Sequence, residues 1–164
     1  MGATRIIGFG RNRDVMTKLK AIAPTRIETL ALGDKPIAEW MRQHTDNLGA
    51  DVLIDCSARG APASTTAEAL HGLKRGGMVV NIGALTEPMP IEPLRFMTSR
   101  LHFRGSNWFT TGEGQLMAEM ASVGVLDLSH YTVQAYPLDR LNDALEAIKA
   151  RPGGLTNIVV NPDH

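Results

Sequence analysis

The sequence predicts an α/β fold in which helices cover both faces of a doubly wound parallel sheet. Short apolar, β-branched runs alternate along the chain with segments whose apolar residues recur at helical spacing. Glycine and proline stand at many of the junctions between these segments. This alternation is typical of parallel sheets, because consecutive parallel strands need a crossover connection. Ligands bind such sheets beyond the carboxyl ends of the strands, so the loops there are the first places to look for a site.

Composition narrows the class of protein. With 164 residues, 43% hydrophobic and 21% charged, the chain is ordinary for a single globular domain. Its 17 Lys and Arg residues balance its 17 Asp and Glu residues, so we expect neither nucleic acid nor a membrane as a partner. No apolar run approaches membrane-spanning length, and the first residues lack a signal-peptide pattern. The single cysteine, Cys56, excludes an internal disulfide and favours a cytoplasmic location.

The first half of the chain is expected to alternate strands with helices. Pro24 ends the first helix, and Asp34 is expected to cap the second. Thr65 and Glu68 have the spacing of a capping box for a third helix that runs to about Leu73. The expected strands are residues 5–9, 26–32, 52–54 and 78–82.

The second half continues the pattern after a proline-rich segment. Thr110 and Glu113 offer another capping box, which predicts a helix after them. The other expected elements are a short helix near residues 93–97, a strand at 101–104, a strand at 131–136, a helix at 138–150 and a strand at 157–160.

Two stretches of the chain resemble a known family. Residues 49–56 read Gly-Ala-Asp-Val-Leu-Ile-Asp-Cys, and residues 73–83 read Leu-Lys-Arg-Gly-Gly-Met-Val-Val-Asn-Ile-Gly. This pair resembles the fourth and fifth strands of the nucleotide-binding domain in medium-chain dehydrogenases/reductases, which include zinc-type alcohol dehydrogenases and quinone-reductase-like proteins. Residues 136–148 and 157–160 are similar to the C-terminal helix and strand of that family. The resemblance implies one Rossmann-like domain, with residues 1–127 as its nucleotide-binding-type core and 128–164 as a strand–helix–strand extension.

The resemblance also indicates what this chain lacks. Residues 5–10 match the second strand of the family, so the first strand, its glycine-rich loop and the preceding catalytic domain are expected to be absent. An alternative takes Gly8-Phe9-Gly10 as the start of a degenerate dinucleotide fingerprint, with Asp34 near the expected distance. Arg13 stands at the third glycine position, where its bulk opposes close helix–strand packing. We therefore prefer the second-strand interpretation.

A sheet without its first strand has a structural problem. In the strand order 3-2-1-4-5-6 the first strand is central, and its removal leaves the second and fourth strands with unpaired inner edges. These two strands could pair directly, a partner chain could fill the slot, or the protein could assemble differently. Direct pairing is the preferred prediction, because it needs no extra polypeptide.

The resemblance implies cofactor-binding candidates in the loops that follow the strands. Gly10 stands where the family has an acidic residue that holds the ribose of NAD, and Arg11 and Arg13 follow it. A glycine beside guanidinium groups favours the 2′-phosphate of NADP, although Arg11, Asn12 and Arg13 also suit a solvated turn capped for the next helix. Without a phosphate loop, and with Thr156 where many relatives carry a basic residue, we expect NADP or NAD to bind weakly. The other candidates, each with an ordinary loop role as its alternative, are Ser57, Ala58, Arg59, Ile82, Gly83, Ala84, Ser106 and Asn107.

No residue is assigned to catalysis or to a metal. In the family the zinc ligands lie in the part that this chain does not match, so no zinc is expected here. Cys56 follows an apolar run and is expected to be a packed, inert thiol. The histidines lack the paired spacing of a zinc site; they are His44, His71, His102, His130 and His164.

The apolar segment from Leu101 to Phe109 predicts a homodimer. In the family the sixth strand is a sheet edge that pairs with its symmetry mate, and such pairing would cover Phe103 and Trp108. The alternative is burial of this segment beneath residues 85–99.

The sequence thus predicts a truncated alcohol dehydrogenase-like oxidoreductase domain that binds NAD(P) and is inactive alone. Two alternatives stay open, namely a non-catalytic dimerising module and a stand-alone nucleotide-binding regulator that uses the loop from Arg11 to Arg13.

Overall fold

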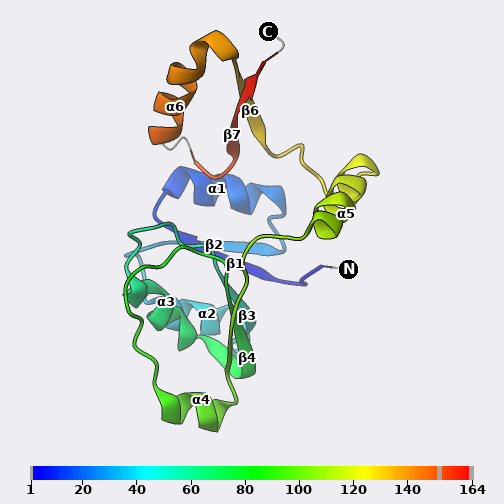
Figure 1. The fold of residues 1–164 in the computed structure, drawn as a ribbon. Coiled ribbons are helices and arrows are strands. Elements are labelled where there is room, and N and C mark those ends of the chain that lie inside the picture. Colours follow the sequence, from blue (N-terminus) through cyan, green and yellow to red (C-terminus); the bar gives the residue numbers. More distant parts are fainter. Residues whose placement is uncertain (1, 151–152, 163–164) are drawn as a thin grey trace. The chain divides into compact units, whose positions relative to one another are not determined.

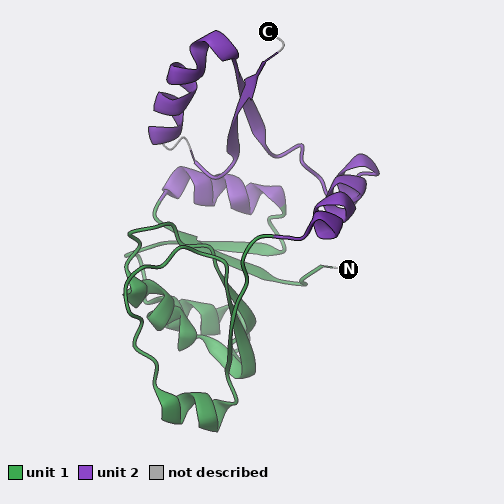
Figure 2. Cartoon of the chain, viewed as in Figure 1, with its two compact units in different colours: residues 1–11, 23–108 green, residues 12–22, 109–164 purple. Residues whose placement is uncertain are grey.

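The chain divides into two compact units (Figures 1 and 2). A computed structural model describes residues 2–150 and 153–162. The first unit takes the chain up to Arg11 and then Ala23–Trp108, and the second takes Asn12–Ile22 and the chain from Phe109 onward. The functional division expected at residue 127 rests on family correspondence and stays a prediction.

The first unit contains two parallel sheets. In the smaller sheet, β1 (Ile6–Gly10) pairs in parallel with β2 (Ile27–Ala31). The larger sheet has the order β3-β4-β5, and both of its pairs are parallel. Its strands are β3 (Ala50–Asp55), β4 (Leu73–Asn81) and β5 (His102–Gly105). The predicted α/β class with parallel strands is confirmed.

Three helices complete the first unit, and one buried cluster joins them to both sheets. The helices are α2 (Ile37–Gln43), α3 (Ala63–Leu70) and α4 (Pro93–Ser99). Apolar side chains from α2, α3 and the strands exclude water together, which is the main favourable contribution to folding. The cluster consists of Leu30, Ile37, Trp40, Met41, Leu53, Ala69, Leu70, Leu73, Val79 and Leu101.

The two sheets of the first unit do not join, and this corrects the preferred sequence prediction. β1 is hydrogen-bonded only to β2 and β3 only to β4 among the described strands, so direct pairing of β1 with β3 was wrong. A cavity of about 890 Å³ lies between them and is lined by residues 3–11 and 50–58. Ile7 and Phe9 pack against the same buried cluster that contains Leu53. The two strands therefore share a core without sharing a hydrogen-bond ladder.

Several local predictions also failed because tertiary partners took the groups involved. Glu68 does not form a capping box with Thr65; its Oε1 accepts a hydrogen bond of 2.6 Å from the backbone N–H of Ile37. Glu68 thereby accepts a hydrogen bond from a backbone N–H at the start of α2. Asp34 was expected to cap this helix. β4 begins at Leu73 rather than at residue 78, because Leu73 pairs with Ala50 before a register shift.

The second unit contains, among its described residues, three helices, α1, α5 and α6, and a parallel sheet of two strands, β6 and β7. The predicted capping box is confirmed: the Thr110 side chain accepts from the Glu113 N–H, and the Glu113 carboxylate accepts from the Thr110 N–H. β6 pairs in parallel with β7, and α6 lies in the connection between them. The elements are α1 (Arg13–Ile22), α5 (Thr111–Ser122), β6 (Thr132–Pro137), the 3₁₀ turn Leu138–Arg140, α6 (Leu141–Lys149) and β7 (Thr156–Asn161).

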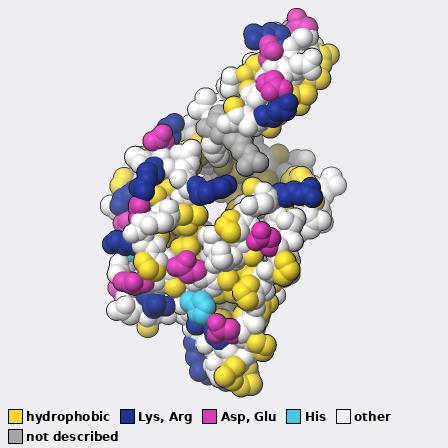
Figure 3. All heavy atoms as spheres, turned by 90° about the vertical axis from the view of Figure 1, so that its left-hand side faces the viewer, with side chains coloured by type: hydrophobic (Ala, Val, Ile, Leu, Met, Phe, Trp, Pro, Cys, Tyr) yellow, Lys and Arg dark blue, Asp and Glu magenta, His cyan; other side chains and the backbone are white. Residues whose placement is uncertain are grey.

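The surface carries mixed charges. On the face in Figure 3, Lys and Arg side chains are interspersed with Asp and Glu, and neither sign gathers into a patch. Within the part of the chain that the structure describes, no helix has the length and apolar character needed to cross a bilayer.

The buried cluster makes a direct prediction about stability. Leu70 is 5% exposed, so Leu70→Ala should lower the free energy of unfolding by roughly 2–5 kcal/mol through lost burial and a residual cavity. Leu94 is 69% exposed, so Leu94→Ala should change it by less than about 0.5 kcal/mol. Urea denaturation followed by tryptophan fluorescence measures both changes in the free energy of unfolding, because Trp40 is buried in the cluster. Equal effects of the two substitutions would contradict the assigned core.

Candidate functional site

The candidate site lies where β1 and β3 end, at the rim of the cavity between them. Gly10 ends β1 and Arg11 follows it, while Ser57 and Ala58 follow β3, and all four line the cavity. We call these four residues the carboxyl-end cluster. The structure therefore brings together four of the predicted cofactor-binding residues. They lie where an open parallel sheet binds its ligands.

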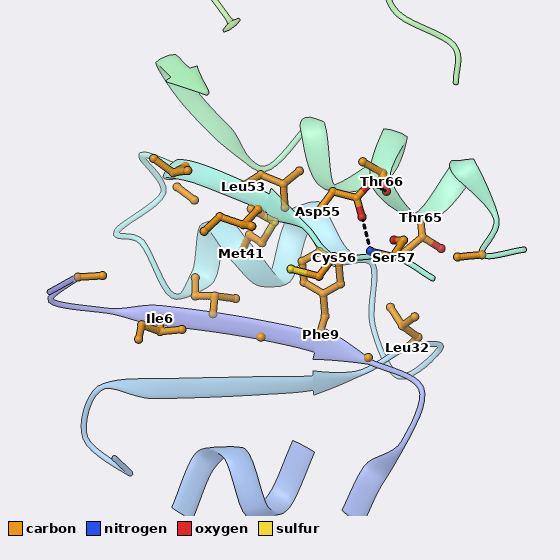
Figure 4. Close-up of a pocket in the computed structure, with 18 of the residues that line it drawn as sticks. Ile6, Phe9, Leu32, Met41, Leu53, Asp55, Cys56, Ser57, Thr65 and Thr66 are labelled. Carbon is orange, nitrogen blue, oxygen red and sulfur yellow. Dashed lines mark hydrogen bonds between the residues drawn. The ribbon is translucent and has the colours of Figure 1, made fainter. Parts of the chain in front are cut away.

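A buried carboxylate holds one side of this cluster in place. Asp55 is 5% exposed, and its Oδ1 accepts a hydrogen bond of 2.9 Å from the Ser57 N–H (Figure 4). Its Oδ2 accepts from the Thr66 hydroxyl of α3 at 3.3 Å, and its backbone carbonyl accepts from the Ile82 N–H. Asp55 thus joins the ends of β3 and β4 to α3. Sequence reasoning missed this role, although an acidic residue that closes an apolar strand was a visible signal.

The loop after β4 supports the cluster without lining the cavity. The Ala84 N–H donates to the Ser57 carbonyl at 2.8 Å, and the Gly83 N–H donates to Asn81 Oδ1 at 3.2 Å. A Cβ atom on Gly83 would lie 2.6 Å from the Ser57 nitrogen, so only glycine fits this close approach. Ile82, Gly83 and Ala84 therefore have a structural role in positioning Ser57, and Asn81 is a second residue that sequence reasoning missed.

The remaining predicted residues are not among those that line the cavity. Ser106 donates its N–H to the Asn81 carbonyl at 2.9 Å, and Asn107 and Arg59 are exposed. Arg13 opens α1 in the second unit. Its neighbour Asn12 caps that helix, because Asn12 Oδ1 accepts from the N–H groups two and three residues on, at 3.0 and 3.1 Å. The helix-cap alternative is thus confirmed for Asn12.

Cys56 is exposed and lines the cavity, which corrects the prediction of a packed thiol. Its sulfur points into the space between β1 and β3 (Figure 4). Partial burial raises the pKa of the Cys56 thiol, and the neighbouring Asp55 carboxylate raises it further. A higher pKa leaves less thiolate near neutral pH, so Cys56 is a poor nucleophile.

No metal centre forms among the residues that the structure describes. No three His, Cys, Asp or Glu side chains within that part of the chain come together as ligands. His164 lies outside the described residues. The closest pairings of imidazole with carboxylate are surface contacts: His71 lies 3.6 Å from Glu92, and His130 lies 3.3 Å from Asp127.

Comparison with known protein families gives one match over most of the chain. Residues 1–122 match the profile of the family described as zinc-binding dehydrogenase. A candidate D-xylulose reductase of Rhizobium meliloti (strain 1021) is 31% identical over 132 residues, covering 77% of this chain and 36% of that protein. The class-3 alcohol dehydrogenase of Myxine glutinosa is 21% identical over 152 residues, covering 91% of this chain and 40% of its own. The chain thus spans well under half the length of these relatives.

Solved structures share the fold. The alcohol dehydrogenase TADH from Thermus sp. ATN1 superposes with a TM-score of 0.82 at 17% identity, over 98% of this chain and 46% of its own. A candidate zinc-binding dehydrogenase from Sinorhizobium meliloti 1021, solved with bound NADP, superposes with a TM-score of 0.78 at 23% identity, over 98% and 46%.

The environment of Cys56 predicts how its reactivity depends on Asp55. Asp55→Asn removes the negative charge but keeps an acceptor for the Ser57 N–H, so the pKa of Cys56 should fall and alkylation at pH 8 should become faster. The pH dependence of the iodoacetamide reaction measures this. Asp51→Asn is the matched control, because the Asp51 carboxylate pairs with Lys74 and should leave the rate unchanged. A slower reaction of the Asp55→Asn variant would contradict the account.

Proposed function

The chain belongs to the zinc-binding dehydrogenase family, and from that premise we propose that it is the NAD(P)-binding part of an alcohol dehydrogenase-like oxidoreductase. The observation that carries the proposal is the carboxyl-end cluster, where Gly10, Arg11, Ser57 and Ala58 line one cavity. A related protein of the same fold has been solved with NADP, which supports a nucleotide as the ligand. We also infer a cytoplasmic location, because the exposed Cys56 thiol suits a reducing compartment.

We propose that NADP is preferred over NAD. Gly10 presents no carboxylate that would repel a 2′-phosphate, and the exposed Arg11 supplies a guanidinium at the same strand end. The Ser57 backbone, fixed by Asp55 and Ala84, would hold the adenosine part in place. When bound, the nicotinamide ring is the group that carries a hydride. Affinity is expected to be weak, because residues 5–10 match the second strand of the family, whereas the glycine-rich loop that cradles a pyrophosphate follows its first strand.

The residues present do not fit a zinc ion, and no step is assigned to one. The described part of the chain brings no set of His, Cys, Asp or Glu side chains together as ligands. Burial and the Asp55 carboxylate raise the pKa of Cys56, the one thiol, which disfavours the thiolate that would bind zinc. We therefore propose that these residues bind and orient a nucleotide and do not turn over an alcohol by themselves.

The free edge of β5 supports a second proposal, a homodimer. Among the described strands β5 pairs only with β4, so its other edge is open. Phe103 is 41% exposed and Trp108 is 86% exposed, whereas Leu101 is buried and its N–H donates to the Phe96 carbonyl. Within the segment from Leu101 to Phe109, only Leu101 is therefore buried as the alternative of burial beneath residues 85–99 expected. Antiparallel pairing of two β5 strands about a two-fold axis would cover the remaining apolar edge.

Two other functions are consistent with parts of this arrangement. The open β5 edge favours a non-catalytic dimerising module, and the Arg11 rim favours a stand-alone nucleotide-binding regulator. Nucleotide binding separates them, because a pure dimerising module would bind no nicotinamide nucleotide.

The NADP proposal predicts a selective effect at Arg11. Arg11→Ala should weaken NADPH binding by about tenfold, the value of one lost charge-assisted hydrogen bond, and should change NADH binding much less. Titration followed by reduced-nicotinamide fluorescence measures both affinities. Arg75→Ala is the matched control, since Arg75 is exposed and does not line the cavity. The proposal fails if the unsubstituted chain gives no saturable signal up to roughly 1 mM NADPH.

The homodimer proposal predicts that one charge on the β5 edge separates the subunits. Phe103→Asp would place like charges opposite each other across the two-fold axis, so light scattering should change from a dimer mass to a monomer mass. Leu94→Asp makes the same chemical change at an exposed position of α4 and should remain dimeric. A monomeric unsubstituted chain would refute the proposal.

A further inference from the structure

The cavity between β1 and β3 has two unpaired strand edges as its walls. We call the space between Ile6–Gly10 and residues 52–56 the slot. Both strands run from left to right in Figure 4, with Phe9 and Cys56 near the same end. β1 takes its hydrogen bonds from β2 and β3 takes its from β4, so each strand turns its other edge toward the slot.

The ladders identify the backbone groups that face the slot. In a parallel pair, alternate residues direct both N–H and C=O to the same neighbour. The Ile6 N–H donates to the Arg26 carbonyl and the Gly10 carbonyl accepts from Leu32, so even-numbered residues of β1 face β2. Ile7 and Phe9 consequently direct their N–H and C=O groups into the slot.

β3, the opposite wall of the slot, shows the same alternation of backbone groups. The carbonyls of Asp55 and Ser57 accept from the N–H groups of Ile82 and Ala84, so odd-numbered residues at this end face β4. Val52 and Ile54 therefore direct their backbone groups into the slot from the other side. Unpaired backbone groups along a strand edge of this kind favour pairing with a further strand.

Side chains around the slot are apolar on both faces of the sheet. On one face, Ile7 and Phe9 pack near Leu53 against the buried cluster. On the other face, Ile6 is 37% exposed, Val52 51% and Ile54 58%. The neighbouring side chains are apolar on both faces, so an occupant of the slot with apolar side chains in both directions would pack against them.

We propose that the slot binds one parallel β-strand of about five apolar, β-branched residues, donated by a partner polypeptide other than this chain. The length follows from β1 and β3, which have five and six residues. The direction follows because β1 and β3 run the same way, so a strand parallel to both can donate hydrogen bonds to each edge and accept them from each edge. This is recognition by strand addition, with two edges instead of one.

A second copy of this chain is a poor donor. Each of the seven strands that the structure describes is already hydrogen-bonded in a sheet. A second copy would have to break one of those ladders to supply the strand. The proposal does not depend on nucleotide binding, since the backbone groups that face the slot belong to Ile7, Phe9, Val52 and Ile54, none of which is in the carboxyl-end cluster.

The test is a titration of the full chain with a labelled synthetic peptide. The probe has five Val and Ile residues flanked by lysines, and fluorescence anisotropy measures its binding. Saturable binding is expected, and a peptide with proline at the central position should bind about tenfold more weakly because a hydrogen bond is lost. Bound peptide should also slow iodoacetamide alkylation of Cys56, whose sulfur points into the slot.

A matched pair of chain variants locates the binding. Ile54→Pro removes an N–H that faces the slot and leaves the ladder to β4 intact, a position where an edge strand tolerates proline. It should weaken peptide binding by about tenfold, whereas Ile54→Val should bind as the unsubstituted chain does. If Ile54→Pro does not fold, protection of Cys56 in the unsubstituted chain still decides the question.

Three results would overturn the proposal. The first is that the peptide does not bind, either free or when it is fused ahead of Met1 through a flexible linker of about 15 residues. The second is that the proline peptide binds as tightly as the unsubstituted peptide. The third is that Cys56 alkylation slows as the protein concentration rises in the absence of peptide. The last result would show that a second copy occupies the slot. If the unsubstituted chain binds the peptide but not NADPH, the proposed function is contradicted and the strand proposal is not.

Discussion

The open edges of β1 and β3 are the constraint on which the rest of the structure depends. Each strand is fully paired on one side, and each directs alternate backbone groups into the space between them. The two strands are held in the first unit by side-chain packing: Ile7 and Phe9 rest on the cluster that contains Leu53 and Met41. Apolar burial therefore holds β1 and β3 together, whereas neighbouring strands within each sheet are held by hydrogen bonds.

The candidate site inherits its geometry from this arrangement. Gly10 and Arg11 belong to one wall of the cavity, and Ser57 and Ala58 belong to the other. Asp55, Asn81 and Gly83 fix the ends of β3 and β4 by hydrogen bonds and close packing, so the second wall is rigid. A strand in the slot would join the two walls into one sheet beneath the carboxyl-end cluster. Strand addition and nucleotide binding would then act on the same scaffold while remaining separately measurable.

Sequence reasoning succeeded where interactions were local. The order of strands and helices followed from periodicity, and the capping box of Thr110 and Glu113 formed because its partners are three residues apart. It failed where a distant partner competed: the Glu68 carboxylate serves Ile37, 31 residues away, instead of its own helix. The bond from Thr66 of α3 to Asp55 was missed for the same reason, whereas the bond from the Ser57 N–H to Asp55 is local. β1 and β3 are brought together by packing on one buried cluster whose members come from distant segments, which no local pattern encodes.

Amide hydrogen exchange of the chain alone tests the central claim most directly. We expect an alternation along β1 and β3: the N–H groups of Ile7, Phe9, Val52 and Ile54 exchange fast, and those of Gly8 and Leu53, which face β2 and β4, exchange slowly. Equal, slow exchange of both sets at every protein concentration would show that β1 and β3 pair directly, and the open slot would be contradicted.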